Sequence, residues 1–366
     1  MEKKKLFYVL TAVMGTMILI IVIFAIISAV GGKRLSYDKI EDKMSSAAKN
    51  YFEDNVSSLP KEEGQSVTVD TSTLVNGKYL KQLSDMAKKG VDCTGKVIVT
   101  KNGDRYLYSP MLNCGSEYKT QKLIDVVTTN NPLVISGDGL YSYGEVSKFK
   151  GDYINNYVKI DNYLWRILDI DSEGYMRLIY ADKQTKEMEE TYVWDNRYNI
   201  DKDSNSGINN YEVSRIKETM KKLETETLYI SDEFKVNLAY RPICVGKRSS
   251  TNVALNNNEE CEVTISNQLF GLPYVSDYVS ASTDANCIDI ASESCKNYNY
   301  LMNSSLSSWT LNGQKEKSYR VFNVGKFGYS ISDASSDKAI RPTIYLSNNA
   351  LYESGNGTKK EPYVVK

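Results

Sequence analysis

Asp201 to Glu212 is the segment whose residue types and spacing best match a metal-binding loop. Acidic or amide oxygens stand at positions 1, 3 and 5, isoleucine at position 8 and glutamate at position 12, which makes the candidate ligands Asp201, Asp203, Asn205 and Glu212. Calcium prefers such an oxygen-rich shell. Position 6 is Ser206, where the calcium-loop template requires glycine for a sharp turn, so the match is incomplete.

A structural interpretation explains the same residues, and it is the one we favour. Asn209 can cap a following helix, and Glu212 can complete a capping box three residues later. The Asp, Ser and Asn residues before them suit a solvated loop. The sequence therefore predicts no cofactor, with calcium as the alternative.

The composition limits the catalytic chemistry of the chain. It contains no histidine, so neither a Ser-His-Asp set nor a Cys-His set can form. Ser-Lys and carboxylate schemes remain, and no spacing singles out one of them. We therefore expect a protein that is not an enzyme, with a carboxylate-dependent surface enzyme as the weaker alternative.

The six cysteines fall into three short-range pairs. Cys93 and Cys114 flank Asn102-Gly103, a strong hairpin signal that would bring them together; the other expected disulfides, each closing a surface loop, are Cys244–Cys261 and Cys287–Cys295. No Cys-x-x-Cys motif suggests zinc or redox chemistry. Because disulfides persist in oxidising compartments, we expect the chain after Arg34 to be extracellular, and we favour this over a cytoplasmic domain with reduced thiols.

Leu6 to Val30 is a run without a charged residue, flanked by lysines and by Lys33-Arg34. As a helix rising ~1.5 Å per residue it would be about 37 Å long, enough to cross a bilayer. Ala29-Val30-Gly31 is a poor signal-cleavage site, and the Gly and Glu of a prepilin leader are missing. We expect a retained single span with residues 1–5 in the cytoplasm, and cleavage near Gly31 as the alternative.

The charge balance excludes one class of partner. The chain carries 45 basic and 46 acidic residues, a formal net charge of -1. This balance lacks the excess of positive charge that binding to nucleic acid requires. Its 28 tyrosines against 8 phenylalanines are compatible with a binding surface, although a biased composition explains them as well.

The elements before residue 139 are expected to form an extension of the membrane helix and a small module. Apolar residues recur every three or four positions from Ser36 to Val56, which predicts a helical stalk over 31–60 with Ser36 as N-cap and Asp38 in its first turn. Its apolar stripe would pack on the next module, or residues 6–58 would self-associate. Residues 61–120 read as a small α/β module with the Asn102-Gly103 hairpin, and turn-forming clusters predict a linker over 121–138.

Residues 139–366 are expected to form a larger, mostly β domain. Runs at 155–160, 163–170 and 175–180 predict a three-stranded meander, and a helix is predicted from Tyr211 to Leu223 with Val213 and Ile216 on its apolar face. Late strands are predicted at 319–324 and 339–346, with a short edge strand at 362–365. The fold class predicted for the whole chain is α+β.

Several motifs in this region carry a resemblance. Asn155-Asn156-Tyr157-Val158, Trp165-Arg166-Ile167, Trp194-Asp195, Gly271-Leu272-Pro273, Tyr300-Leu301, Trp309-Thr310-Leu311 and Ile340-Arg341-Pro342 occur in the order seen in uncharacterised bacterial surface domains. Those domains look like variants of the C-type-lectin-like fold shared with formylglycine-generating enzymes. Less specifically, the layout of the first 120 residues resembles minor pilins and pseudopilins.

The resemblance implies a fold and a ligand-binding region, but not catalysis. Formylglycine-generating enzymes work through reactive cysteines, whereas the cysteines here are expected to form structural disulfides. Trp165 and Trp194 are expected in the core. For Trp309 we weigh core packing against exposure in a ligand groove, where the candidate ligand-binding residues are Trp309, Thr310, Asn312 and Arg341. Ser308, Thr310 and Asn312 depart from the pattern of the relatives, so no ligand preference follows.

Together these observations predict a bacterial membrane-anchored surface protein. Its C-terminal domain is expected to bind an extracellular glycan or protein without catalysis. The alternative from a different class is a pilin-like subunit of a surface filament or secretion apparatus.

Overall fold

The structure is a computed structural model that describes residues 34–181, 191–250, 260–302 and 306–366. Contacts between Cα atoms divide the chain into two units. The smaller unit consists of Met1–Ser58, Thr68–Ile98 and Pro110–Thr120, and the larger one of Leu59–Val67, Val99–Ser109 and Gln121–Lys366. Helices and strands occur in both, which confirms the α+β class.

The predicted membrane span, Leu6–Val30, and the tail before it lie outside the described residues. Among the helices that the structure does describe, none is long and apolar enough to cross a membrane.

The smaller unit is built around helix α2 (Tyr37–Asp54), which occupies most of the predicted stalk. Its apolar stripe is buried: Ile40, Met44, Ala47, Ala48 and Phe52 are at most 3% exposed. The helix packs against α3 (Thr71–Asn76), and α4 (Leu83–Met86) follows in the same unit. Ser36 is at the N-cap position, but its side chain makes no capping hydrogen bond, and Asp38 lies in the first turn as predicted.

The sheet of the N-terminal region has the order β1-β2-β3, from β1 (Ser66–Asp70), β2 (Thr94–Asn102) and β3 (Arg105–Asn113). Gly103 lies in the β2–β3 turn with φ of +56°, a conformation that favours glycine. The hairpin brings Cys93 and Cys114 together in a disulfide, as predicted. The residues at its turn, Val99–Ser109, group with the larger unit, so the predicted module 61–120 is not one compact body.

The larger unit contains a ten-stranded sheet with the path β10-β19-β8-β7-β6-β21-β20, to which β14, β4 and β5 also pair. The predicted meander forms its centre, as β6 (Tyr157–Ile160), β7 (Tyr163–Asp171) and β8 (Met176–Tyr180). The remaining strands are β4 (Gly139–Tyr143), β5 (Val146–Lys150), β10 (Leu238–Ala239), β14 (Phe270–Gly271), β19 (Thr343–Leu346), β20 (Tyr352–Ser354) and β21 (Tyr363–Val365).

Two predictions for this sheet need correction. Strand β21 is not an edge strand, because it pairs in parallel with β6 on one side and antiparallel with β20 on the other. The predicted linker 121–138 contains helix α5 (Leu123–Asn130), whose Leu123 and Val127 are fully buried in the core of the larger unit. That segment is therefore part of the folded body.

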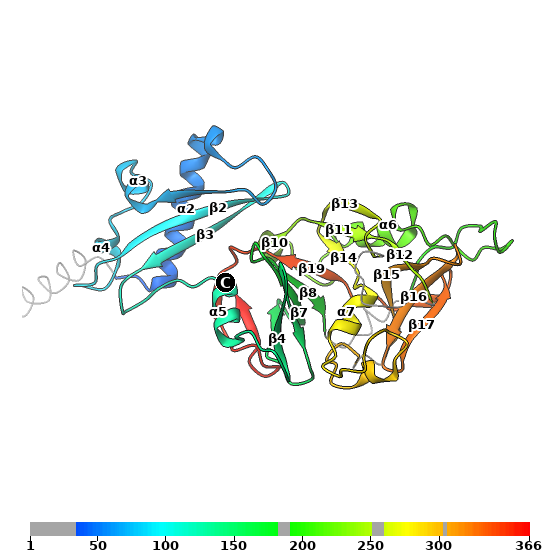
Figure 1. Ribbon diagram of the computed structural model, residues 1–366. Helices are drawn as coiled ribbons and strands as arrows, with labels where there is room; N and C mark the ends of the chain where they lie inside the picture. The colour runs from blue at the N-terminus through cyan, green and yellow to red at the C-terminus, as the bar shows by residue number, and fades with distance from the viewer. Residues whose placement is uncertain (1–33, 182–190, 251–259, 303–305) are drawn as a thin grey trace, which may run out of the picture. The chain divides into compact units, whose positions relative to one another are not determined.

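A second, four-stranded sheet has the order β12-β15-β16-β17 (Figure 1). Its strands are β12 (Lys247–Arg248), β15 (Ser308–Gln314), β16 (Arg320–Gly325) and β17 (Gly328–Asp333). Two small sheets pair β11 (Arg241–Val245) with β13 (Val263–Gln268) and β9 (Tyr192–Val193) with β18 (Asp337–Lys338). Besides α5, the described helical segments of the larger unit are η3 (Tyr211–Val213), α6 (Arg215–Lys222), η4 (Phe234–Asn237), α7 (Val275–Ser280) and η6 (Glu293–Lys296).

The three tryptophans lie in the core of the larger unit, each with no exposed surface. The predicted helix 211–223 is split into η3 and α6, and Ser214 caps α6 by accepting a hydrogen bond from the amide of Lys217 at 3.2 Å. Ile216 is buried as predicted, whereas Val213 is 52% exposed and does not join the apolar face.

Candidate binding surface

The segment predicted as a possible calcium loop folds differently from that template. Its positive φ angles fall at Asp203 and Gly207, positions 3 and 7, where the template has its turn at position 6. The Asp201 carboxylate accepts a hydrogen bond from Ser318, and that of Asp203 accepts one from Tyr198. The two acids thus have separate partners, and no group of three or more metal-ligating side chains occurs among the described residues. The structure offers no support for calcium binding here.

The favoured capping interpretation of this segment is wrong in detail. Asn210, not Asn209, caps the short helix η3 by accepting a hydrogen bond from the amide of Glu212 at 3.0 Å. The buried amide of Asn209 instead donates to the carbonyls of Gln314, Lys317 and Arg320, at 2.7, 2.8 and 2.9 Å. Asn209 therefore fixes the β15–β16 connection.

The expectation that Trp309, Thr310 and Asn312 line an open groove is not met. All three side chains have no exposed surface. The indole nitrogen of Trp309 donates to the carbonyl of Tyr192 at 2.6 Å, and the Thr310 hydroxyl donates to that of Phe322 at 2.8 Å. The Asn312 oxygen accepts from the amide of Val275 at 2.8 Å, which joins β15 to the start of α7. The geometry is that of a packed core.

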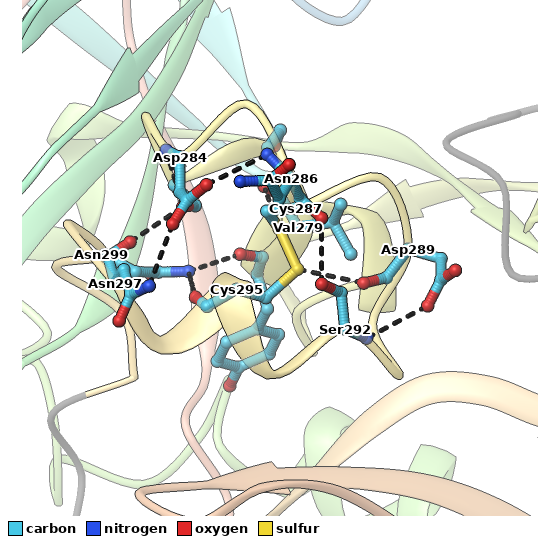
Figure 2. The surroundings of a disulfide bond; sticks show 12 residues. Val279, Asp284, Asn286, Cys287, Asp289, Ser292, Cys295, Asn297 and Asn299 are labelled. Carbon is cyan, nitrogen blue, oxygen red and sulfur yellow. Dashed lines mark hydrogen bonds between the residues drawn. A yellow bond between two sulfur atoms is a disulfide. The ribbon is translucent and has the colours of Figure 1, made fainter.

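The loop from Ser282 to Tyr300 is closed by the disulfide Cys287–Cys295 (Figure 2). Short polar side chains hold its turns. The Asp284 carboxylate accepts from the side chain of Asn297 at 2.8 Å and from the amide of Asn286 at 2.9 Å. These bonds lower the pKa of Asp284 below its usual range. The loop is therefore fixed by one covalent link and by charge-assisted hydrogen bonds.

Three large apolar side chains are exposed on this loop and on the turn beside it. Ile288 is 65% exposed, Tyr298 is 59% exposed and Phe327, in the β16–β17 turn, is 85% exposed. Helix η6 within the loop contacts β17, and the side chain of Lys296 lies next to Gly328, which follows Phe327. In Figure 1 the loop (yellow) lies next to β17 (orange). We call Ile288, Tyr298 and Phe327 the loop-end surface.

The base of the loop is tied to the large sheet. The amide of Gly151 donates to the carbonyl of Ala281 at 2.9 Å, and the amide of Tyr300 donates to that of Gly151 at 3.0 Å. The side chain of Asn299 donates to the carbonyls of Tyr278 and Cys295 at 2.6 and 2.7 Å. This anchoring sets the position of Tyr300, whose ring is buried.

Arg166 of β7 lies against the ring of Tyr300 and is only 5% exposed. Its guanidinium carbon is 4.3 Å from the ring centroids of both Tyr300 and Tyr157. Its Nε donates to the side-chain oxygen of Asn156 at 2.7 Å. Burial lowers the pKa of Arg166, and the like charge of Arg341 adds to this effect, whereas the two tyrosines and Asp152 oppose it.

Arg341 is the one predicted ligand-binding residue whose side chain is partly exposed. Its Nε donates to the carbonyl of Tyr180 at 3.1 Å, and its Nη1 donates to that of Leu301 at 3.0 Å. Because Leu301 follows Tyr300, adjacent residues of the chain contact Arg341 and Arg166. The sequence motifs predict a ligand-binding role for Arg341 and none for Arg166.

The smaller unit has a hollow of its own, of about 790 Å³, which no motif in the sequence predicts. It lies between α2 and the segments that contain α3 and α4. Apolar side chains and lysines line it together, among them Ala47, Leu80, Met86, Lys43, Lys78 and Lys81. Residues from separate segments form this lining, so no local spacing in the sequence indicates it.

Comparisons with known proteins do not name a relative. No family model, curated protein or solved structure matches the chain. The resemblances to C-type-lectin-like domains and to pilins therefore stay hypotheses that rest on the sequence motifs and layout alone.

Proposed function

We propose that this chain is a membrane-anchored surface protein whose larger unit binds an extracellular glycan or protein through the loop-end surface, without catalysis. The observation that carries this proposal is the exposure of Ile288, Tyr298 and Phe327 on and beside a disulfide-closed loop. Apolar groups that are held in water by a rigid frame lose little conformational entropy when a partner covers them.

Burial of these three side chains by a partner would contribute to recognition. Full burial of a large apolar side chain contributes about 1.5–3 kcal/mol, and aromatic rings add specific stacking geometry. Tyr298 also carries a hydroxyl that can bond to a polar partner. Three such side chains therefore suit a binding surface for a sugar face or for a protein patch.

The disulfides support an extracellular location. Cys93–Cys114, Cys244–Cys261 and Cys287–Cys295 pair as predicted, and no cysteine of the chain is free. Such bonds persist in oxidising compartments. The proposed anchor is Leu6–Val30, with residues 1–5 in the cytoplasm.

The binding function is tested with full-length protein in a mild detergent, screened against immobilised glycans and cell-surface proteins. Phe327→Ser should abolish or strongly weaken binding to the ligand that the screen finds. Ile200→Ser is the matched control, because Ile200 is also 85% exposed but lies in another loop of the larger unit. Equal loss in both variants, or no ligand of either class, would contradict the proposal.

The location is tested separately by protease treatment of intact cells. Cleavage of the larger unit in intact cells, with residues 1–5 still protected, is the expected result. Protection of the larger unit until the cells are lysed would overturn the topology. Filaments formed by the full chain, with no ligand bound, would instead favour the assembly-subunit alternative.

A further inference from the structure

Arg166 is a buried cation without a carboxylate partner. No acidic side chain among the described residues has an oxygen within 4.0 Å of its guanidinium nitrogens. Apart from the bond to Asn156, its Nη2 lies 3.5 Å from the carbonyl of Ile154, and no acceptor within the described residues bonds Nη1. Other arginines of the larger unit that are as deeply buried are ion-paired: Arg177 with Asp169 and Asp277, and Arg248 with Glu260.

A second unpaired cation lies in the same neighbourhood. Arg341 forms no ion pair with the described residues; it donates to the carbonyls of Tyr180 and Leu301, and its charge acts on the buried hydroxyl of Tyr278. Its charge acts on Arg166, and the two side chains contact the adjacent residues Leu301 and Tyr300. Both guanidinium groups lack an ion-pair partner among the described residues, and burial strengthens the electrostatic interactions that such groups make.

The acidic residue Asp152 acts against the desolvation of Arg166. Asp152 acts on Arg166 electrostatically but is beyond ion-pair distance, and its backbone amide donates to the Asp138 carboxylate at 3.2 Å. It reduces the positive charge without occupying the guanidinium. An anion that reaches Arg166 would therefore compete with Asp152.

We propose that Arg166 and Arg341 bind a carboxylate carried by the ligand of the larger unit, such as the carboxylate of an acidic sugar. This inference rests on the proposed glycan-binding function and narrows its ligand class. A planar guanidinium fork matches the two oxygens of a carboxylate, and the rings of Tyr157 and Tyr300 hold the fork of Arg166 in one plane. Tyr300, one of the two rings that lie against Arg166, ends the loop that carries Ile288 and Tyr298.

The test measures binding of glucuronate to the full-length protein by calorimetry, with glucose and sulfate as comparison ligands. Glucuronate should bind, glucose should bind at least ten times more weakly, and higher ionic strength should weaken glucuronate binding. Arg166→Gln and Arg341→Gln should each weaken it by about ten-fold or more, as expected for the loss of a charged hydrogen bond. Arg320→Gln is the control, because Arg320 is exposed and lies 3.6 Å from Asp333.

Asp152→Asn provides a test in the opposite direction, because removal of the competing charge should tighten glucuronate binding two- to three-fold. If Arg166→Gln fails to fold, Arg341→Gln and Asp152→Asn still decide the question. Equal binding of glucuronate and glucose, stronger binding of sulfate, or no response to Arg341→Gln and Asp152→Asn would each overturn the inference. A glycan screen that finds only neutral ligands, sensitive to Phe327→Ser, would overturn it while the proposed function stands.

Discussion

Two arginines on neighbouring strands of the large sheet are equally buried but differently neutralised. Arg177 on β8 and Arg166 on β7 are each 5% exposed. Arg177 forms ion pairs with Asp169 and Asp277, and its Nη1 donates to the Asp277 carboxylate at 3.0 Å. Arg166 has two aromatic rings and one amide instead. Carboxylates of the protein thus offset the cost of burying the charge of Arg177, whereas the neighbours of Arg166 offset that cost only in part.

The difference indicates which of the two regions is structural. Arg177 joins β7, β8 and helix α7, and Asp277 also accepts a hydrogen bond from the amide of Tyr274 at 2.8 Å in a capping box. Its donors are used within the fold. The guanidinium of Arg166 has no carboxylate partner among the described residues, so an anion from outside the protein would supply the missing negative charge. The predictions below test this contrast.

The largest effect is expected for Arg177→Met. This change leaves two buried carboxylates without their cation, and breaking a buried pair in this way costs about 3–5 kcal/mol. Urea denaturation of the full chain measures the loss. Arg320→Met is the control, since Arg320 is 44% exposed and should change stability by less than about 0.5 kcal/mol. A similarly small change for Arg177→Met would show that the cluster is not a structural centre.

The double change Cys287→Ser and Cys295→Ser is expected to have the next largest effect. The bond closes a loop over a sequence separation of 8, for which chain entropy predicts a loss of roughly 2–3 kcal/mol. Because Tyr300 ends this loop, glucuronate binding at Arg166 should also weaken. Denaturation and calorimetry on the same variant measure both effects. Unchanged glucuronate binding would separate the loop from the Arg166 site.

Arg166→Met should destabilise the protein less than Arg177→Met does. It removes two cation–π contacts of roughly 0.5–2 kcal/mol each and one hydrogen bond, but it also removes the cost of burying an unpaired cation. A net loss of about 1–2 kcal/mol is expected, measured by the same denaturation. A loss equal to that of Arg177→Met would mean that Arg166 is as structural as Arg177, and the contrast would fail.

The sequence predicted local features well and long-range ones poorly. The meander, the hairpin and the Cys93–Cys114 disulfide follow from turn signals and alternating patterns, and the other two disulfides follow from the short spacing of their cysteines. The burial of Trp309 and the parallel pairing of β21 with β6 depend on residues far apart in the chain, which no local pattern records. The surroundings of Arg166 were predicted only in part. Tyr157 lies opposite it in the predicted β6–β7 pair, but Tyr300 comes from a distant segment of the chain.

The position of the glycine turn also distinguishes the segment Asp201–Glu212 from a calcium-binding loop. Asp201 and Asp203 have the residue types of a calcium loop, but the chain reverses at Gly207, where an added Cβ would lie 2.2 Å from the carbonyl oxygen of Asp195. Glycine is thus required one position later than the template places it. This one-residue difference in glycine placement is visible in the sequence.

The smallest expected effect concerns a third buried arginine, Arg248, whose Nη1 is 2.6 Å from the Glu260 carboxylate. Burial raises the pKa of Glu260, although Arg248 and Ser276 act against this. The folded protein therefore binds a proton more tightly than the unfolded chain, so the free energy of unfolding should fall as pH rises from the ordinary glutamate pKa, about 4.3, through the raised one. Denaturation midpoints measured across this interval should show that slope, and Glu260→Gln should remove it.

Glu316 supplies a control of opposite sign for this pH dependence. Burial would raise its pKa, but hydrogen bonds from Ser249 and Ser250 lower the pKa of Glu316 to about 2. Its contribution is present above the ordinary glutamate pKa and is lost as pH falls toward 2, and solvent screening limits it to less than about 1 kcal/mol. Glu316→Gln should therefore leave the slope above pH 4.3 intact. If Glu260→Gln also leaves this slope intact, burial does not set the pKa of Glu260. The charge of Arg248 would then be neutralised as fully as that of Arg177.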